Sequence, residues 1–258
     1  MTHEPWTLAL GALAGLACGF LNTAASSGSA VSLPILMMIG LDPLTANATN
    51  RIPVLVGALS ATHSFHRRGA LPWRLAGRIA APVTLGAIAG AGLAEVVPSR
   101  DLGLIITAAV MVAFALLFTK VKAALEQAIP RPDERFRWTH AAIFFGIGAW
   151  LGFIVLDGAT YLLLALVLVV GLPLLHANAV KSFALVPTAL VALMLFAWKG
   201  LVDWEVGVAL GLGAIVGGLL GAKLSASPNA KRYVFWLLVL VIGGEIIHLA
   251  IQYFFATV

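Results

Sequence analysis

Two cations embedded in apolar segments are the residues of this sequence best placed to do chemistry. Arg51 follows an Ala-Asn-Ala-Thr-Asn run, and Lys181 follows an Ala-Asn-Ala-Val run. Because a cation in hydrocarbon is costly, each one needs an anion, a carboxylate or water. We therefore predict that both bind a small anion; the alternative is that both snorkel to lipid headgroups. The amides beside them join the predicted site: Asn47, Asn50 and Asn178.

A short polar joint at residues 22–29 supplies neutral donors for the same site. Backbone N–H groups at the start of a helix attract anions, and hydroxyl and amide groups can share the oxygens of a tetrahedral or pyramidal oxyanion. Helix capping is the alternative role for these side chains. The predicted ligands in this joint are Asn22, Thr23, Ser26, Ser27, Gly28 and Ser29.

The second half of the chain has a different joint, with a carboxylate at Asp157. This group could neutralise Arg51 or Lys181, or it could take up a proton during coupled transport. It could equally be the N-cap of the next helix. We therefore predict a coupling or counter-charge role for Asp157 and keep capping as the alternative.

Other site chemistries are not supported by the sequence. His63 and His66 alone would leave a four-coordinate metal site half empty, and Cys18 is the single cysteine. Neither a Ser-His-Asp arrangement nor a phosphate-binding loop is suggested. We predict no cofactor, no metal and no enzymatic activity.

The elements that must position these residues are apolar segments that cross or enter a membrane. Of 258 residues, 61% are hydrophobic and only 10% are charged, against roughly 45 to 50% apolar residues in soluble domains. Such a chain is a polytopic, all-α membrane protein. The predicted segments are 7–21, 29–40, 45–65, 74–97, 102–121, 139–155, 160–171, 177–198, 204–222 and 233–255.

The ten segments form two related halves. A shift of 131 residues takes Leu41 to Leu172 and Trp73 to Trp204, and the register holds from about residue 40 to 93. The first two segments of each half are short for a full span of about 20 residues, which suggests a re-entrant or broken helix pair. Short, interrupted segments at matching places indicate a transport site. We predict a first repeat at 1–122, a linker at 123–138 and a second repeat at 139–258.

A helix pair plus three spanning helices crosses the bilayer an odd number of times, so the second repeat should be inverted. Twelve of the sixteen lysines and arginines fall in one set of alternate loops, and two, Arg100 and Lys199, fall in the other. The positive-inside rule places the richer set in the cytoplasm and both termini outside. The net charge of +5 therefore reflects topology rather than nucleic-acid binding. Glycine-faced helices would allow a homodimer.

Several motifs together resemble the TauE/SafE family of membrane proteins, once called DUF81. They begin with Gly19-Phe-Leu-Asn-Thr-Ala-Ala-Ser-Ser-Gly-Ser29 and Ala46-Asn-Ala-Thr-Asn-Arg51, and continue with Phe65-His-Arg-Arg-Gly69, Ala177-Asn-Ala-Val-Lys181 and Gly200-Leu-Val-Asp-Trp204. The resemblance implies an inverted-repeat permease of the cell (inner) membrane for sulfite or organosulfonates, usually regarded as an exporter. This chain departs from the family where Ala24-Ala-Ser-Ser27 and Val155-Leu-Asp157 replace glycine-rich stretches.

These observations lead to one functional prediction. The chain is expected to be a secondary transporter that exports a small sulfur-containing oxyanion by alternating access, with the substrate and the lipid bilayer as its partners. Two alternatives remain at this point. One is a membrane sensor or assembly subunit that keeps the fold without transport, and the other is a passive anion channel.

Overall fold

Helices form all the regular structure in the part of the chain that the structure describes. The computed structural model describes residues 4–24, 26–117, 138–156 and 158–224, and no strand occurs within them. The helices of the first half are α1 (Pro5–Ala24), α2 (Ser29–Met38), α3 (Pro43–Thr49), α4 (Arg51–Arg67), α5 (Trp73–Val96) and α6 (Ser99–Leu117). Those of the second half are the 3-10 turn η1 (Trp138–His140), α8 (Ala141–Phe153), α9 (Gly158–Leu168), α10 (Leu174–Trp198) and α11 (Trp204–Leu224). The prediction of an all-α polytopic membrane protein is confirmed.

The longer helices have the length and surface of membrane spans. Among the described residues, α1, α5, α10 and α11 are long and apolar enough to cross a bilayer. Large apolar side chains point outward from three of them: Leu13 is 66% exposed, Leu85 61% and Leu212 64%. A polypeptide with this composition places such side chains against lipid rather than water.

Two segments differ from their predicted bounds, and one lies outside the described residues. Helix α1 has 20 residues and is long enough to span, although a short segment was expected there. The predicted segment 45–65 is divided at Asn50 into α3 and α4. Pro53 explains the division, because it has no N–H to donate to the carbonyl of Thr49 one turn earlier. The segment predicted at 233–255 lies outside the described residues.

The repeat seen in the sequence extends to the backbone conformation. Gly40 and Gly171, which are 131 residues apart, both have positive φ, at 99° and 83°. Gly69 and Gly200 form a second such pair, at 68° and 70°. These four turns end helices at equivalent places, because glycine tolerates the left-handed conformation that a helix C-terminus uses.

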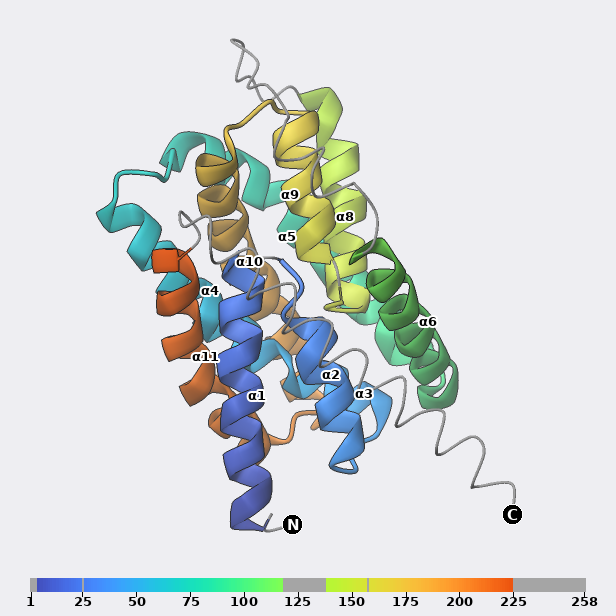
Figure 1. Ribbon diagram of the computed structural model, residues 1–258. Helices are drawn as coiled ribbons and strands as arrows, with labels where there is room; N and C mark the ends of the chain where they lie inside the picture. The colour runs from blue at the N-terminus through green and yellow to red at the C-terminus, as the bar shows by residue number, and fades with distance from the viewer. Residues whose placement is uncertain (1–3, 25, 118–137, 157, 225–258) are drawn as a thin grey trace.

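The two halves are packed crosswise through glycines. Helix α1 packs on α11 of the second half, and α8 packs on α5 of the first half (Figure 1). A Cβ atom on Gly19 would collide with the backbone of Ala214, and one on Gly152 would collide with that of Ala87. The same kind of contact is made by Gly86, Gly90, Gly213 and Gly217. These glycines serve contacts within the chain, so they give no support to the predicted homodimer.

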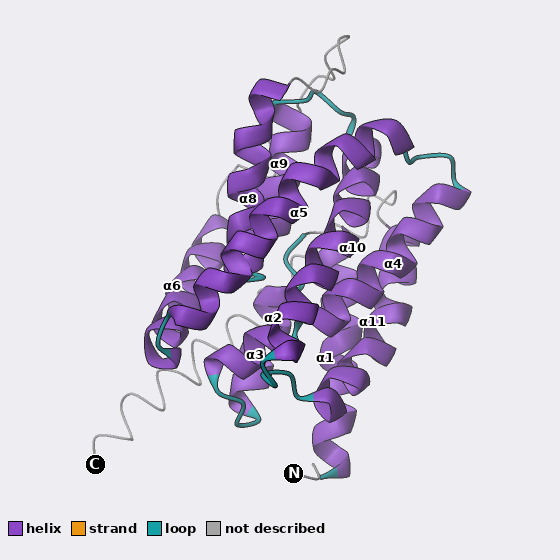
Figure 2. Cartoon of the chain, turned by 180° about the vertical axis from the view of Figure 1, so that it is seen from behind, coloured by secondary structure: helices purple, strands orange, loops and turns teal. Residues whose placement is uncertain are grey.

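The helix pairs α1–α2 and α8–α9 approach the middle of the molecule from its two ends. In Figure 1, α1 rises from the end where the N-terminus lies and α2 returns toward it, whereas α8 and α9 extend to the upper end. The view from behind shows the same arrangement (Figure 2). We call residues 22–29 the first tip and residues 151–160 the second tip. The two tips meet, since Thr160 Oγ1 donates to the carbonyl oxygen of Ser26 at 3.0 Å.

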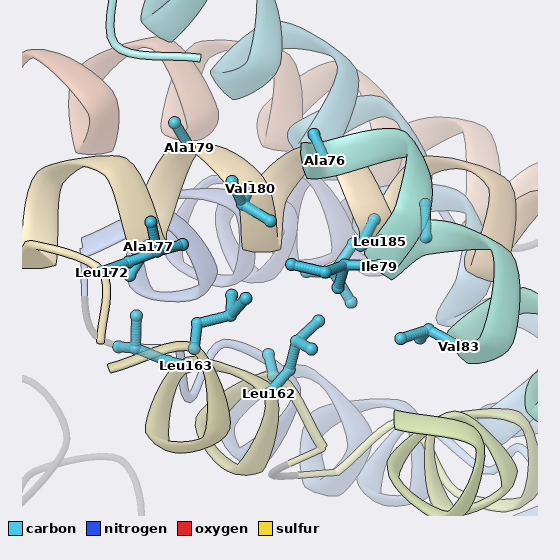
Figure 3. Close-up of a cluster of buried hydrophobic side chains, with 14 of the residues drawn as sticks. Ala76, Ile79, Val83, Leu162, Leu163, Leu172, Ala177, Ala179, Val180 and Leu185 are labelled. Carbon is cyan, nitrogen blue, oxygen red and sulfur yellow. The ribbon is translucent and has the colours of Figure 1, made fainter. Parts of the chain in front are cut away.

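A cluster of buried aliphatic side chains fixes α9 and α10 against α5 (Figure 3). Ile79 and Val83 come from α5, Leu162 from α9, and Val180 and Leu185 from α10. Val180 precedes Lys181, so this packing holds the backbone from which the second buried cation extends.

At one end of the described structure the basic segment after α4 contacts the end of α11. Arg68, at the end of α4, donates to the carbonyl oxygen of Ala222 in the last turn of α11 at 2.9 Å. The connection between α10 and α11 lies at the other end, where Lys199 Nζ is 3.7 Å from Glu95 Oε2. The orientation in which the end bearing Arg68 is cytoplasmic stays a prediction.

Candidate functional site

Arg51 reaches from the first half into the second tip. It is the first residue of α4 and is only 1% exposed, so it does not snorkel. Its guanidinium donates to the carbonyl oxygens of Leu151 and Gly152, the latter at 2.8 Å. These carbonyls belong to the last turn of α8, which is the negative end of that helix. Arg51 therefore caps a helix of the opposite half.

Lys181 makes the reciprocal connection from the second half to the first tip. It is fully buried, and its Nζ donates to the carbonyl oxygen of Asn22 at 2.8 Å and to Ser26 Oγ at 2.7 Å. The amide oxygen of Asn178 accepts a third hydrogen bond at 3.0 Å. Since an ammonium group has three N–H donors, these contacts use all of them. Lys181 thus caps the end of α1 much as Arg51 caps the end of α8.

The amides that precede the cations in sequence hold them in place. Asn47 Oδ1 accepts from Arg51 at 3.2 Å, and its Nδ2 donates to the carbonyl oxygen of Phe153 at 2.9 Å. The backbone N–H of Val155 donates to the same Oδ1 at 3.3 Å. Asn47 and Asn178 are related by the 131-residue shift and play the same part, each accepting a hydrogen bond from the cation that follows it in the sequence.

Ser26 is the residue where the two tips join. Its hydroxyl oxygen accepts a hydrogen bond from Lys181 Nζ, and its carbonyl oxygen accepts one from Thr160 Oγ1. With a φ of 62°, it is also the one non-glycine residue with positive φ in the described chain. Such a conformation persists only where the surroundings hold it, and here two donors from the second half do so. Thr160 was missed by sequence reasoning, although it is the repeat counterpart of the predicted ligand Ser29.

Other predicted residues of the first tip bond or pack within the tip. The N–H of Gly28 donates to Asn22 Oδ1 at 2.9 Å, and Thr23 Oγ1 donates to the carbonyl oxygen of Gly19 at 2.9 Å. A Cβ atom on Gly28 would collide with the backbone of α1 at Cys18, so its glycine serves close packing of the helix pair. Ser27 is half-buried in the same tip. Gly158 faces the side chain of Leu151 in the second tip.

Around the first tip and the first turn of α4, three buried donors remain without a hydrogen-bond partner. They are Ser29 Oγ, Asn50 Nδ2 and Arg51 Nε, and nothing among the described residues accepts from them. The amide oxygen of Asn50 does have a partner, since Ser32 Oγ donates to Oδ1 at 2.6 Å. Buried polar groups in proteins nearly always have partners, so each of these exceptions requires an explanation. A bound anion would satisfy donors of all three types.

One predicted residue cannot be placed, and the histidine pair has no metal-site partners among the described residues. Asp157 lies outside the described residues, so its role remains a prediction. His66 Nδ1 accepts a hydrogen bond from Trp73 Nε1 at 3.3 Å, and no group of three potential metal-binding side chains occurs in the described ranges.

A multi-pass helical protein with broken helices and buried cations at their ends has the construction of a membrane transporter. The family comparison agrees: the description "Sulfite exporter TauE/SafE" applies to a family model that matches residues 11–246. The chain belongs to the TauE/SafE family, and the resemblance noted in its motifs is confirmed.

Curated relatives carry matching descriptions. A Sinorhizobium protein described as "Probable membrane transporter protein ORF9" is 29% identical over 225 residues, covering 85% of this chain and 83% of its own. The Escherichia coli protein described as "Probable membrane transporter protein YfcA" is 28% identical over 214 residues, covering 83% and 78%. No solved structure matches the chain. The chain is therefore a membrane transporter and not an enzyme.

Proposed function

We propose that this transporter exports a small sulfur-containing oxyanion, sulfite or an organosulfonate, across the cell membrane. The observation that carries the proposal is the group of unpartnered, buried donors at Ser29, Asn50 and Arg51. Oxygen atoms of a sulfite or sulfonate group would accept from such donors, and the negative charge would offset the burial of a guanidinium. The description of the matching family names sulfite, which supports this class of substrate.

Alternating access is the mechanism that we propose, with one repeat rocking against an inverted partner. Its support is the crossed bonding of Arg51 and Lys181, each of which joins its own half to the tip of the other half. A rocking motion would change the relative position of the tips where Thr160 meets Ser26. The opposite approach of the two helix pairs in Figure 1 supports inversion of the repeats.

The site in this proposal retains the predicted ligands in two roles. Ser29, Asn50 and Arg51 offer donors, whereas Lys181 and the amides of Asn47 and Asn178 hold the charged framework. Asn22, Thr23, Ser26, Ser27 and Gly28 shape the first tip. Asp157 lies outside the described residues; its proposed role is to supply a counter-charge or carry a proton, since the pKa of a carboxyl group shifts with nearby charges and burial.

Anion flux in proteoliposomes tests the proposal directly. Purified protein would be reconstituted, and efflux of sulfite and of sulfoacetate would be compared with efflux of acetate. We expect saturable flux of the sulfur oxyanions well above that of acetate. Absence of flux for every anion would overturn the transport proposal. Flux that is electrogenic, fails to saturate and ignores a proton gradient would indicate a passive channel instead.

A further inference from the structure

The 131-residue repeat pairs two residues of the first half with two of the second, and the pairs differ in their bonding. Asn50 corresponds to Lys181 within the matched register, and Ser29 falls opposite Thr160 when the same shift is continued back along α2 and α9 from the equivalent turns at Gly40 and Gly171. In the second half both residues donate to Ser26, with Thr160 Oγ1 at 3.0 Å from its carbonyl oxygen and Lys181 Nζ at 2.7 Å from its hydroxyl. In the first half the same two positions carry donors without partners.

From this difference we infer that the oxyanion binds asymmetrically, between Ser29 Oγ and Asn50 Nδ2 at the N-terminus of α2. Lys181 and Thr160 are then positioning residues that fix the first tip and do not contact the anion. The inference rests on the proposed function and deepens it, because it assigns the binding donors to one half.

The geometry brings the two donors to one face of α2. Ser29 is the first residue of this ten-residue helix and is 2% exposed. Ser32 lies three residues later, on the same face, and its hydroxyl donates to Asn50 Oδ1 at 2.6 Å. Asn50 is fully buried against that face, and this bond leaves its Nδ2 as the remaining donor. The positive end of the α2 dipole adds to the attraction for an anion.

In the second half, the donors at these repeat positions bond to protein oxygens. The repeat fold therefore does not by itself leave such donors without partners, and their lack of partners is specific to the first half. Neutral donors also suit a transported ligand. A site must bind its anion well enough to collect it and weakly enough to release it. An amide at position 50 provides a hydrogen bond without the full charge that its counterpart Lys181 carries.

The test compares matched variants at the two repeat positions. Ser29→Ala and Asn50→Asp each remove one proposed donor, while Thr160→Ala removes the equivalent hydroxyl of the second half. Sulfite affinity would be measured from the ligand-induced rise in thermal stability of the purified full-length protein, with sulfoacetate and acetate run alongside. We expect the sulfite Kd to rise about tenfold for Ser29→Ala, the size of one lost hydrogen bond to a charged group, and to rise further for Asn50→Asp, which also places a carboxylate beside the anion.

The control is expected to show the opposite pattern. Thr160→Ala loses the bond to Ser26, so its ligand-free thermal stability should fall, while its sulfite Kd should rise less than that of either first-half variant because no bond to the anion is lost. Ser29→Ala should keep its ligand-free stability, because no protein bond is removed. Unchanged Kd values for both first-half variants, or an equal loss for Thr160→Ala, would overturn the inference while the parent still binds sulfite. A parent protein that binds neither sulfite nor sulfoacetate would instead overturn the proposed function.

Discussion

Lys181 donates a 2.7 Å hydrogen bond to the hydroxyl of Ser26, a residue held at a φ of 62° in the opposite half of the chain. The bond joins a buried charge to a tip that would otherwise have little reason to keep this conformation. Because Arg51 bonds the other tip in the same manner, the site depends on contacts that cross between the halves.

Removing the Lys181 ammonium should destabilise the protein. In Lys181→Met the buried oxygens of Asn22 and Ser26 lose their donor, at a cost of about 1–3 kcal/mol for each unsatisfied group. Thermal unfolding in detergent would measure the loss. Lys199→Met is the matched control, because Lys199 is 57% exposed and its pair with Glu95 contributes at most about 1 kcal/mol. Equal losses in the two variants would contradict the role given to Lys181.

Charge alone should not replace Arg51. Arg51→Lys keeps a cation but cannot bond the carbonyl oxygens of Leu151 and Gly152 together as the planar guanidinium does. We expect sulfite flux to fall at least about tenfold, since a charged hydrogen bond contributes about 1.5–3 kcal/mol. Arg51→Ala should abolish anion binding altogether.

Arg74→Lys provides the control for that experiment, because Arg74 is exposed in the first turn of α5. Its proteoliposome flux should equal that of the parent. Parental flux in Arg51→Lys would show that only the charge of residue 51 matters.

Glycines at the crossed helix contacts should not tolerate a methyl group. In Gly19→Ala and Gly152→Ala the added Cβ meets the backbone of Ala214 or Ala87, which cannot move aside cheaply. The expected loss of stability is about 1–3 kcal/mol or more for each variant. Gly92→Ala has open space around its Cβ and should be neutral or stabilised by up to about 1 kcal/mol through helix propensity. Thermal unfolding of the three variants would measure these changes in stability. Similar unfolding temperatures for all three would argue against the close packing of α1 on α11 and of α8 on α5.

Asp42 should make stability depend on pH at the end of the molecule away from the basic loops. Burial raises the pKa of this carboxyl group, but hydrogen bonds from Thr45, Ser99 and Leu44 outweigh burial and hold the pKa below its usual value. The carboxylate therefore stabilises the fold above the unfolded pKa of about 3.9, and this contribution is lost as the pH falls through the lower folded pKa. Asp42→Asn should unfold at a lower temperature than the parent at pH 6, with the difference shrinking toward pH 3. A constant difference across that range would contradict this assignment.

Proton coupling through Asp157 can be tested by its pH profile. Asp157→Asn removes a titratable group while keeping nearly the same shape and the ability to cap a helix. If the carboxylate carries protons, sulfite flux in the variant should lose part of its dependence on pH. An unchanged profile would leave capping as the role of this residue.

The repeat, the all-helical fold and the importance of Arg51 and Lys181 could all be predicted from the sequence. Their partners could not, because Arg51 bonds backbone carbonyls at Leu151 and Gly152, and every residue type provides such carbonyls. A sequence shows which cations lie in apolar segments, but not which helix end their side chains reach. The break at Asn50 could have been predicted, because Pro53 lies four residues after Thr49 and has no N–H to donate to its carbonyl oxygen.

The crossed caps have a consequence for how the chain can fold. If the two halves were separated, the carbonyl oxygens at the end of α1 would lose the ammonium group that donates to them. Those at the end of α8 would lose the guanidinium group. Neither half holds the cation that its own helix pair requires, so each half depends on the other to complete its helix cap. Two half-length chains made separately would each leave one set of tip carbonyl oxygens without a cation, and only their association would restore both caps.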